Sequence, residues 1–169
     1  NFLATSTNYG HFAFQLTHLL FDKYGLVILG MDNNAFKSRL IPILEEDILN
    51  NSSKKLVEQT QEKLAGLGYK PQAFVRDINI FYRRDGIRNR IELDNGQYLI
   101  NDTDISFSKD ELIQELHARP ERFSPNVILR PLFQELILPN LAYIGGGGEL
   151  AYWLERKSQF EHYQLPYPM

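Results

Sequence analysis

The chain has 169 residues, of which 43% are hydrophobic and 12% aromatic, enough for the core of one globular domain or of parts of two. A net charge of −3 gives no overall attraction to nucleic acid or to anionic membranes, and no apolar run approaches the roughly 20 residues that span a bilayer. The absence of cysteine excludes disulfides, thiolate nucleophiles and cysteine-based zinc sites within this chain, and it fits a cytoplasmic protein. The chain begins without Met or a signal-peptide pattern, and we interpret it as a piece of a longer protein.

Residues 1–31 predict a helix followed by a strand. Gly25 is the expected end of the helix, and the apolar run at 26–31 is typical of a strand buried on both faces, as in a parallel sheet. The predicted apolar face of the helix consists of Phe12, Leu16, Leu19 and Leu20.

Residues 32–68 predict two more helices. The first is expected to be interrupted at Pro42, and the second to begin at a serine N-cap and to end at Gly66 or Gly68. One face of the second helix would carry Leu56, Thr60 and Leu64.

A different pattern begins at Tyr69. The turn signals Asp85-Gly86 and Asn95-Gly96 lie between alternating apolar residues and predict a three-stranded antiparallel meander. The residues expected on one face of the meander are Ile78, Ile80, Tyr82, Ile87, Ile91 and Leu93. A helix should follow, because Ser108 and Glu111 form a capping box.

The last part of the chain predicts helix, strand, glycine loop and helix. Pro131 suits the first turn of the first helix, 141–144 is a second short apolar run, and four glycines precede the final helix. Helices that alternate with buried strands predict an α/β fold, the second part of a Rossmann-like core with an antiparallel meander and helix inserted. We divide the chain into core segment 1–68, connecting insertion 69–123 and core segment 124–169 with the glycine loop.

The glycine loop is the first candidate site. Gly146, Gly148 and Ala151 fit the pattern G-x-G-x-x-A of a dinucleotide-binding turn, although four adjacent glycines match many patterns. Glu149 would stand at the helix N-terminus, where it suits the helix dipole and repels a phosphate. We therefore favour an amine-bearing ligand. The competing interpretation is a flexible loop in which Glu149 only compensates the dipole.

A second candidate is the row Asn126, Arg130 and Gln134, whose spacing of four places it on one face of a continuous helix. Arg130 could hold a carboxylate while the two amides orient it. The competing interpretation is a polar surface stripe, and a helix broken at Pro131 would remove Asn126 from the row.

Two further groups received structural interpretations. The arginines around the Asp85-Gly86 turn suit an anion or nucleic acid, but outward charges that prevent edge pairing fit the acidic chain better. This group consists of Arg83, Arg84, Arg88 and Arg90. The four histidines lack metal-ligand spacing, and we expect no metal site.

Long stretches of the sequence resemble the bacillithiol biosynthesis cysteine-adding enzyme family. The resemblance is strongest from Tyr69 to the end, and Gly147 stands where that family usually has proline. It is carried by "LGYKP", "NIFYRRDGIRNRIELDNGQYLI", "FSKDELIQELHARPERFSPN" and "SPNVILRPLFQELILPNLAYIGGGGELAYWLERKSQFEHYQLPYPM".

The resemblance implies a ligase that adds L-cysteine to the amine of glucosaminyl malate. It also implies a Rossmann-like core whose earlier half lies outside this chain, and a full-length homodimer held by a coiled coil that is absent here. The residues do not identify the cosubstrate, for which ATP or ADP is the candidate. We expect this chain alone to be inactive. The substrate-binding residues expected on this basis are Asn126, Arg130, Gln134, Gly146, Gly148, Glu149 and Tyr152.

Two alternatives stay open at this stage. One is another nucleotide-dependent α/β enzyme such as a nucleotidyl transferase, and the other is a non-catalytic domain that binds a partner through its arginine-bearing ribbon. No catalytic residue is assigned.

Overall fold

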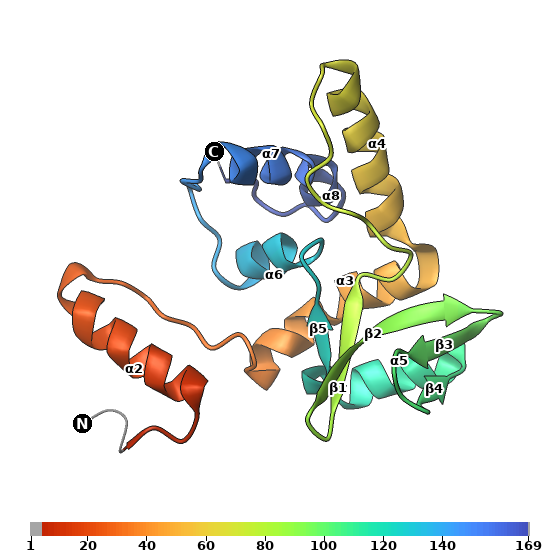
Figure 1. Cartoon of the computed structure of the whole chain (residues 1–169), viewed down its shortest axis with the longest axis horizontal. Helices are drawn as coiled ribbons and strands as arrows, with labels where there is room; N and C mark the ends of the chain where they lie inside the picture. Colours follow the sequence, from red (N-terminus) through yellow and green to blue (C-terminus); the bar gives the residue numbers. More distant parts are fainter. Residues whose placement is uncertain (1–4, 169) are drawn as a thin grey trace. The chain divides into compact units, whose positions relative to one another are not determined.

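The structure is a computed structural model that describes residues 5–168 (Figure 1). The chain divides into two compact units, Asn1–Met31 and Asp32–Met169, and each is described by itself.

The first unit contains the predicted helix, α2 (Tyr9–Phe21), followed by the short 3-10 helix η1 (Asp22–Tyr24). The Asn8 side chain caps α2 by accepting a hydrogen bond from the backbone N–H of His11. Gly25 ends the segment with φ of +74°, a left-handed conformation that glycine adopts without steric cost. The helix and its glycine stop are therefore confirmed.

The second unit opens with α3 (Asn34–Asn50) and α4 (Ser52–Gly66). The predicted interruption at Pro42 is wrong, because α3 runs through it. Proline removes one backbone hydrogen bond, and the burial of one face of α3 outweighs that loss. The predicted serine cap is also wrong: Asn51 is the N-cap, and Ser52 is already helical.

The second unit contains a five-stranded antiparallel sheet, in the order β4-β3-β2-β1-β5. Asp85-Gly86 connects β1 to β2 and Asn95-Gly96 connects β2 to β3, and all four turn residues have positive φ as type I′ hairpins require. The strands are β1 (Ile80–Arg84), β2 (Ile87–Asp94), β3 (Gln97–Ile100), β4 (Ser106–Phe107) and β5 (Phe123–Pro125).

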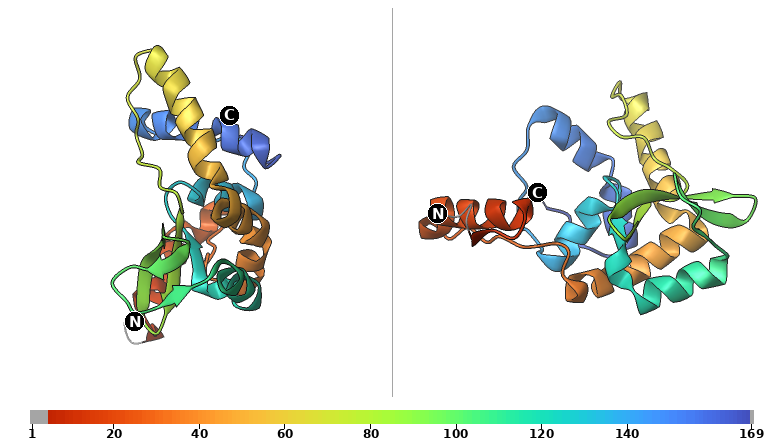
Figure 2. Two further views of the ribbon diagram at one scale, coloured as in Figure 1. Left: turned by 90° about the vertical axis from the view of Figure 1, so that its right-hand side faces the viewer. Right: turned by 60° about the horizontal axis from the view of Figure 1, so that its bottom comes forward.

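Helices cover one face of this sheet (Figure 2). There α3 packs with α5 (Lys109–Ala118), which contacts β3 and β4. The predicted capping box is confirmed, with Ser108 as N-cap and Glu111 at the third helical position. The buried apolar side chains on this sheet are Ile80, Tyr82, Ile91, Tyr98, Ile100 and Phe123, whereas Leu93 of the predicted face is exposed.

The C-terminal part of the second unit is helical. It consists of α6 (Arg130–Ile137), α7 (Gly147–Leu154) and α8 (Lys157–His162), and η2 (Pro120–Arg122) precedes β5. Pro131 lies in the first turn of α6, as predicted. α4 packs against α8, and α3 packs against α6.

Neither apolar run predicted as a buried strand forms a strand in the structure. Residues 26–31 and 141–144 lack strand pairing among the described residues. Leu141 is 92% exposed and Ile144 is 98% exposed. A strand of a parallel sheet is buried by neighbours on both sides, and the described part of the chain supplies none for these runs. Helices combined with a sheet still make the fold α/β.

The predicted segment boundaries at 68/69 and 123/124 stay predictions. Phe123–Pro125 forms strand β5 and pairs with β1, so the second boundary passes through a strand of the antiparallel sheet.

Candidate functional site

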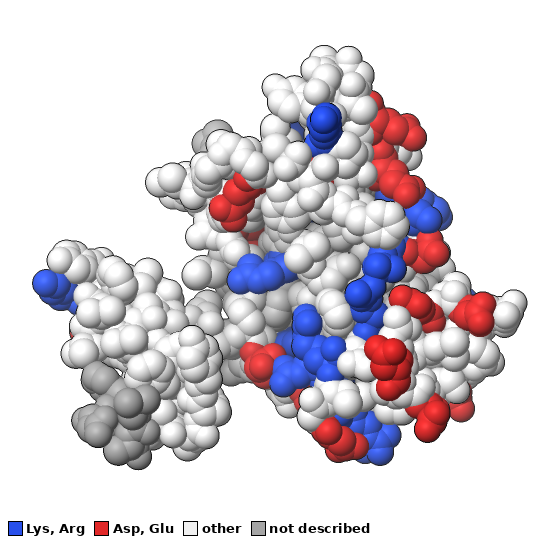
Figure 3. All heavy atoms as spheres, viewed as in Figure 1, with Lys and Arg blue, Asp and Glu red and all other residues white. Residues whose placement is uncertain are grey.

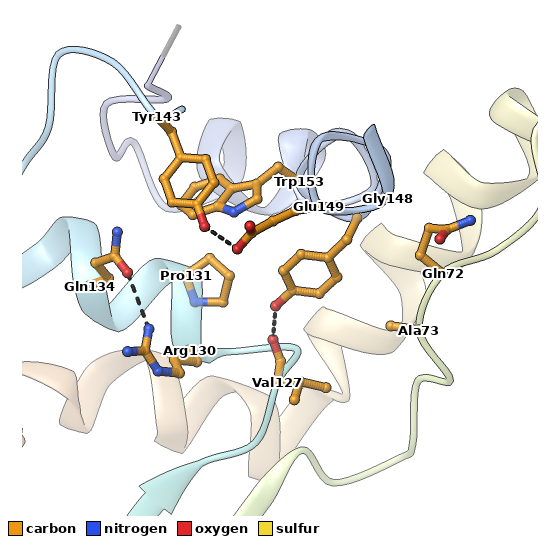
Figure 4. A pocket seen from close by; sticks show the side chains of 11 residues that line it. Gln72, Ala73, Val127, Arg130, Pro131, Gln134, Tyr143, Gly148, Glu149 and Trp153 are labelled. Atoms are coloured by element: carbon orange, nitrogen blue, oxygen red, sulfur yellow. Dashed lines mark hydrogen bonds between the residues drawn. The ribbon is translucent and has the colours of Figure 1, made fainter. Parts of the chain in front are cut away.

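A cavity of about 600 Å³ opens beside α6 and the first turns of α7 (Figure 4). Its walls come from α6, α7, the turn before α6, the loop before α7 and the segment that connects α4 to β1. The lining residues are Gln72, Ala73, Val127, Arg130, Pro131, Gln134, Tyr143, Gly148, Glu149, Tyr152 and Trp153.

One wall carries the predicted pair Arg130 and Gln134. They lie one turn apart on α6, and the Arg130 Nη1 donates a hydrogen bond of 3.1 Å to the Gln134 Oε1 (Figure 4). A guanidinium has five N–H donors, and this bond uses one of them. Arg130 can therefore hold a carboxylate in the cavity while Gln134 keeps its orientation.

Asn126 does not line the cavity with this pair. Its Nδ2 donates to the Oδ1 of Asn79 at 3.1 Å, and its Oδ1 accepts from the backbone N–H of Ile128 at 2.8 Å. Because α6 begins only at Arg130, Asn126 belongs to the turn before the helix and ties that turn to the segment before β1.

The facing wall carries Glu149 in the first turn of α7. The Tyr143 hydroxyl donates a hydrogen bond to the Glu149 carboxylate, and the Tyr143 ring lies 4.2 Å from that of Trp153, centroid to centroid (Figure 4). That hydrogen bond and burial raise the pKa of Tyr143. An ionised carboxylate has about four acceptor positions, so Glu149 can also receive an ammonium group.

Tyr152 supports the same wall from one turn further along α7. Its hydroxyl donates to the Val127 carbonyl oxygen in the turn before α6. Burial raises the pKa of Tyr152 to about 12, although the nearby Arg156 and Arg130 charges oppose that rise. The hydroxyl therefore stays protonated and keeps α7 against the turn before α6 at neutral pH.

A buried carboxylate holds the third wall in place. Glu155, which is 1% exposed, accepts hydrogen bonds from the backbone N–H of Gln72 at 2.5 Å and from the Gln61 Nε2 at 3.0 Å. It also pairs with the fully buried Arg156 at 2.6 Å. Gln61 in turn donates to the Ala73 carbonyl at 2.9 Å. These contacts fix the lining residues Gln72 and Ala73 relative to the end of α7.

The glycine loop does not have the geometry of a dinucleotide-binding turn. Gly146 is the N-cap of α7 and lies outside the cavity lining, while Gly148 lines it, and the element before the loop is helix α6 rather than a strand. Gly145 has a clear steric role: a Cβ there would lie 3.1 Å from the Tyr143 ring and 3.4 Å from the Glu149 side chain. The glycine allows Tyr143 to approach Glu149.

The structure also adds residues that were not predicted from the sequence. Trp153 could have been found, because it lies four residues after Glu149 on the same helical face. Tyr143 was hidden inside the run interpreted as a strand. Gln72, Ala73 and Val127 carry no local signal, since they reach the cavity through contacts between distant segments.

Residues 5–168 contain no group of three His, Asp or Glu side chains placed to hold a metal ion. Two histidines pair with acidic side chains of α3: His117 with Glu45 at 2.9 Å and His162 with Glu46 at 2.6 Å. No helix within the same residues is long and apolar enough to cross a membrane.

The comparisons with known proteins agree on one family. The family model described as bacillithiol biosynthesis BshC, N-terminal Rossmann-like domain, matches residues 1–169. The chain is 51% identical over 150 residues to a protein of Christiangramia forsetii, covering 89% of this chain and 28% of that protein. It is 49% identical over 154 residues to a protein of Flavobacterium johnsoniae, covering 91% of this chain and 29% of that protein.

A more distant relative from Bacillus pumilus is 37% identical over 149 residues, covering 87% of this chain and 26% of that protein. All three relatives bear the name "Putative cysteine ligase BshC". The chain spans less than a third of the length of each. With the family model matching throughout, this chain belongs to the BshC family of bacillithiol biosynthesis, within its N-terminal Rossmann-like domain.

Proposed function

We propose that this chain supplies part of the substrate site of a ligase that joins L-cysteine to the amine of glucosaminyl malate. The observation that carries the proposal is one cavity with a cationic Arg130 on one wall and an anionic Glu149 on another. A substrate that bears both a carboxylate and an amine needs such a pair of opposite charges. The family and the names of the relatives supply the reaction class.

Each proposed contact follows from the chemistry of the side chain. Arg130 holds a carboxylate of malate or of cysteine through its fork of N–H donors, and Gln134 orients that fork. Glu149 receives an amine, while Tyr152 and Gly148 shape the wall beside it. Asn126 and Gly146 act indirectly, one in the turn before α6 and the other as the N-cap of α7.

Amide formation creates a C–N bond and requires an activated carboxyl group, commonly an adenylate or an acyl phosphate. We assign neither that activation nor the general base to a residue of this chain, and ATP is the candidate cosubstrate. We further propose that the full-length parent is a cytoplasmic homodimer, and that the 169-residue chain alone has no turnover.

The test uses the full-length parent with L-cysteine and glucosaminyl malate, with and without ATP, and detects the cysteinyl product by mass spectrometry. Product that depends on ATP supports the proposal and identifies the activation chemistry. Absence of product from a protein shown by circular dichroism to be folded would contradict the proposed reaction.

Variants then test the two charged contacts. Arg130→Gln and Glu149→Gln should each lower kcat/KM roughly tenfold to a hundredfold, because each removes a charge-assisted hydrogen bond. Matched controls are Arg84→Gln, in the β1–β2 hairpin, and Glu161→Gln, on α8, both exposed and outside the cavity. Unchanged kinetics in Glu149→Gln would show that the assignment of Glu149 is wrong.

A further inference from the structure

A second group of charged residues lies away from the cavity, at the edge of the sheet formed by β5. Figure 3 shows basic side chains gathered over β1 and β5, with acidic atoms beside them. The members of this group, which we call the edge cluster, are Asp32, Lys37, Arg83 and Arg88. None of them lines the cavity.

Two arginines of the edge cluster lie directly opposite each other. Arg83 of β1 and Arg88 of β2 are cross-strand partners, which places their Cβ atoms roughly 5 Å apart. Like charges at such positions destabilise a sheet. The repulsion also contributes to lowering the pKa of Arg88, after burial, which is the larger cause.

The Arg88 guanidinium is held in one orientation. It stacks on the Phe81 ring, 3.9 Å from the ring centroid, and donates to the Ser124 Oγ at 3.1 Å and more weakly to the Pro125 carbonyl at 3.4 Å. A guanidinium fixed by stacking loses less side-chain entropy when it binds a ligand. Arg88 is therefore preorganised.

A buried lysine adds a third positive charge. Lys37 is 3% exposed, and its Nζ donates to the Phe123 carbonyl of β5 at 2.8 Å. Burial lowers the pKa of Lys37; the Asp32 charge opposes this shift, and the charges of Arg83 and Arg88 add to it. Lys37 thus contributes positive potential from beneath the surface rather than a direct contact.

One carboxylate balances these three cations. Asp32 lies 2.6 Å from the Arg83 Nη1 and 3.6 Å from the Lys37 Nζ, and its side chain is 70% exposed. Three cations and one carboxylate leave an excess of two positive charges. An exposed carboxylate with one close hydrogen bond can be displaced by a stronger acceptor.

We propose that the edge cluster binds a small oxyanion of charge −2, of the phosphoryl class, which sits between Arg83 and Arg88 and competes with Asp32. A phosphoryl group matches the excess charge, and its oxygens accept the paired N–H donors of guanidinium groups. Binding would relieve the cross-strand repulsion. This site is independent of the proposed ligase reaction and is tested without it.

The experiment titrates the folded full-length protein with inorganic phosphate and with pyrophosphate at low ionic strength, using calorimetry, with chloride at equal ionic strength as reference. Wild type should bind at this site, and Arg83→Gln should bind about tenfold more weakly after losing a charge-assisted contact. Arg83→Lys should fall between them, because it keeps the charge and loses the fork. Asp32→Asn should bind several-fold more tightly, because the competing carboxylate is gone.

The control is Arg84→Gln, since alternation along β1 places Arg84 on the opposite face from Arg83. It should bind phosphate as wild type does. Absence of binding to wild type, or equal losses in Arg84→Gln and Arg83→Gln, would overturn the proposal. So would loss of binding in Arg130→Gln with none in Arg83→Gln, because the anion would then belong to the cavity.

Discussion

Two buried carboxylates of the C-terminal helices differ from Glu149, the carboxylate that lines the cavity. Glu155 and Glu135 are each 1% exposed and accept several hydrogen bonds, Glu135 from both the backbone and the side chain of Asn140. Glu149 is exposed, and within residues 5–168 its hydrogen-bond partner is Tyr143. Each of the two buried carboxylates accepts three hydrogen bonds and fixes a backbone N–H, whereas Glu149 accepts one from the described residues and keeps acceptor positions for a ligand. The two regions should therefore respond differently to mutation.

The largest change in the free energy of unfolding is expected for Glu155→Ala. The change leaves the Gln72 N–H without an acceptor, removes one of the two acceptors of the Gln61 amide, and leaves the buried Arg156 charge uncompensated. We expect a loss of about 3–5 kcal/mol in the free energy of unfolding, measured by urea denaturation.

Hydrogen exchange locates the cause of that loss. The amide of Gln72 should exchange faster in Glu155→Ala, because its acceptor is removed. Glu161→Ala, an exposed glutamate on α8, is the control and should change stability by no more than about 0.5 kcal/mol. If both variants were equally stable, Glu155 would not support the wall.

An intermediate loss of stability is expected for Glu115→Gln, which changes a partly buried carboxylate on α5. Although burial opposes its ionisation, hydrogen bonds from the Tyr82 hydroxyl at 2.8 Å and from Arg122 at 2.5 Å hold the pKa of Glu115 below its ordinary value of 4.5. Glu115→Gln should cost about 1–2 kcal/mol at pH 7, because a charge-assisted acceptor is lost.

The sign of the pH dependence follows from the lowered pKa. A carboxyl whose pKa is lower in the folded state stabilises the fold above its unfolded pKa, and that contribution fades as the pH falls through the folded value. The stability difference between wild type and Glu115→Gln should therefore be constant near pH 7 and shrink below about pH 4.5. A difference independent of pH from 7 to 3 would show that packing, not charge, is lost.

Local sequence signals predicted a good part of this fold. Asp85-Gly86 and Asn95-Gly96 form turns with positive φ, Ser108 caps its helix and Pro131 lies in a first turn, because each depends on backbone chemistry within a few residues. Pro42 was misjudged, since the packing of α3 decides its continuity and lies outside any local window.

The residues of the candidate site also fall into those that local sequence signals predicted and those that depend on distant contacts. Arg130 and Gln134 were predicted from helical spacing, Glu149 from its place after the glycine loop and Tyr152 with the family resemblance, and all four line the cavity. The role of Glu155 could not be predicted, because its partner Gln72 lies 83 residues away. The apolar runs 26–31 and 141–144 were misread for a related reason: burial of a strand depends on neighbours that the run itself does not specify.

The smallest change in the free energy of unfolding is expected for Gly147→Pro, at the start of α7, and it should stabilise the protein. Gly147 is the first residue of α7, where proline is favoured because the first N–H groups of a helix have no partner within it. The preceding Gly146 has φ of −70° and ψ of 166°, the extended conformation that a residue before proline adopts. A Cβ on Gly147 would meet no atom within 4 Å.

Proline at this position should therefore stabilise the protein by about 0.4–1 kcal/mol, chiefly by restricting the unfolded chain. Urea denaturation measures the gain, with Gly145→Ala as the contrasting variant. Gly145→Ala should destabilise, because its Cβ would lie 3.1 Å from the Tyr143 ring and would push Tyr143 away from Glu149. Destabilisation by Gly147→Pro would mean that α7 needs the conformational freedom of glycine at its first residue. It would also mean that the cavity wall formed by α7 is not preformed for a ligand.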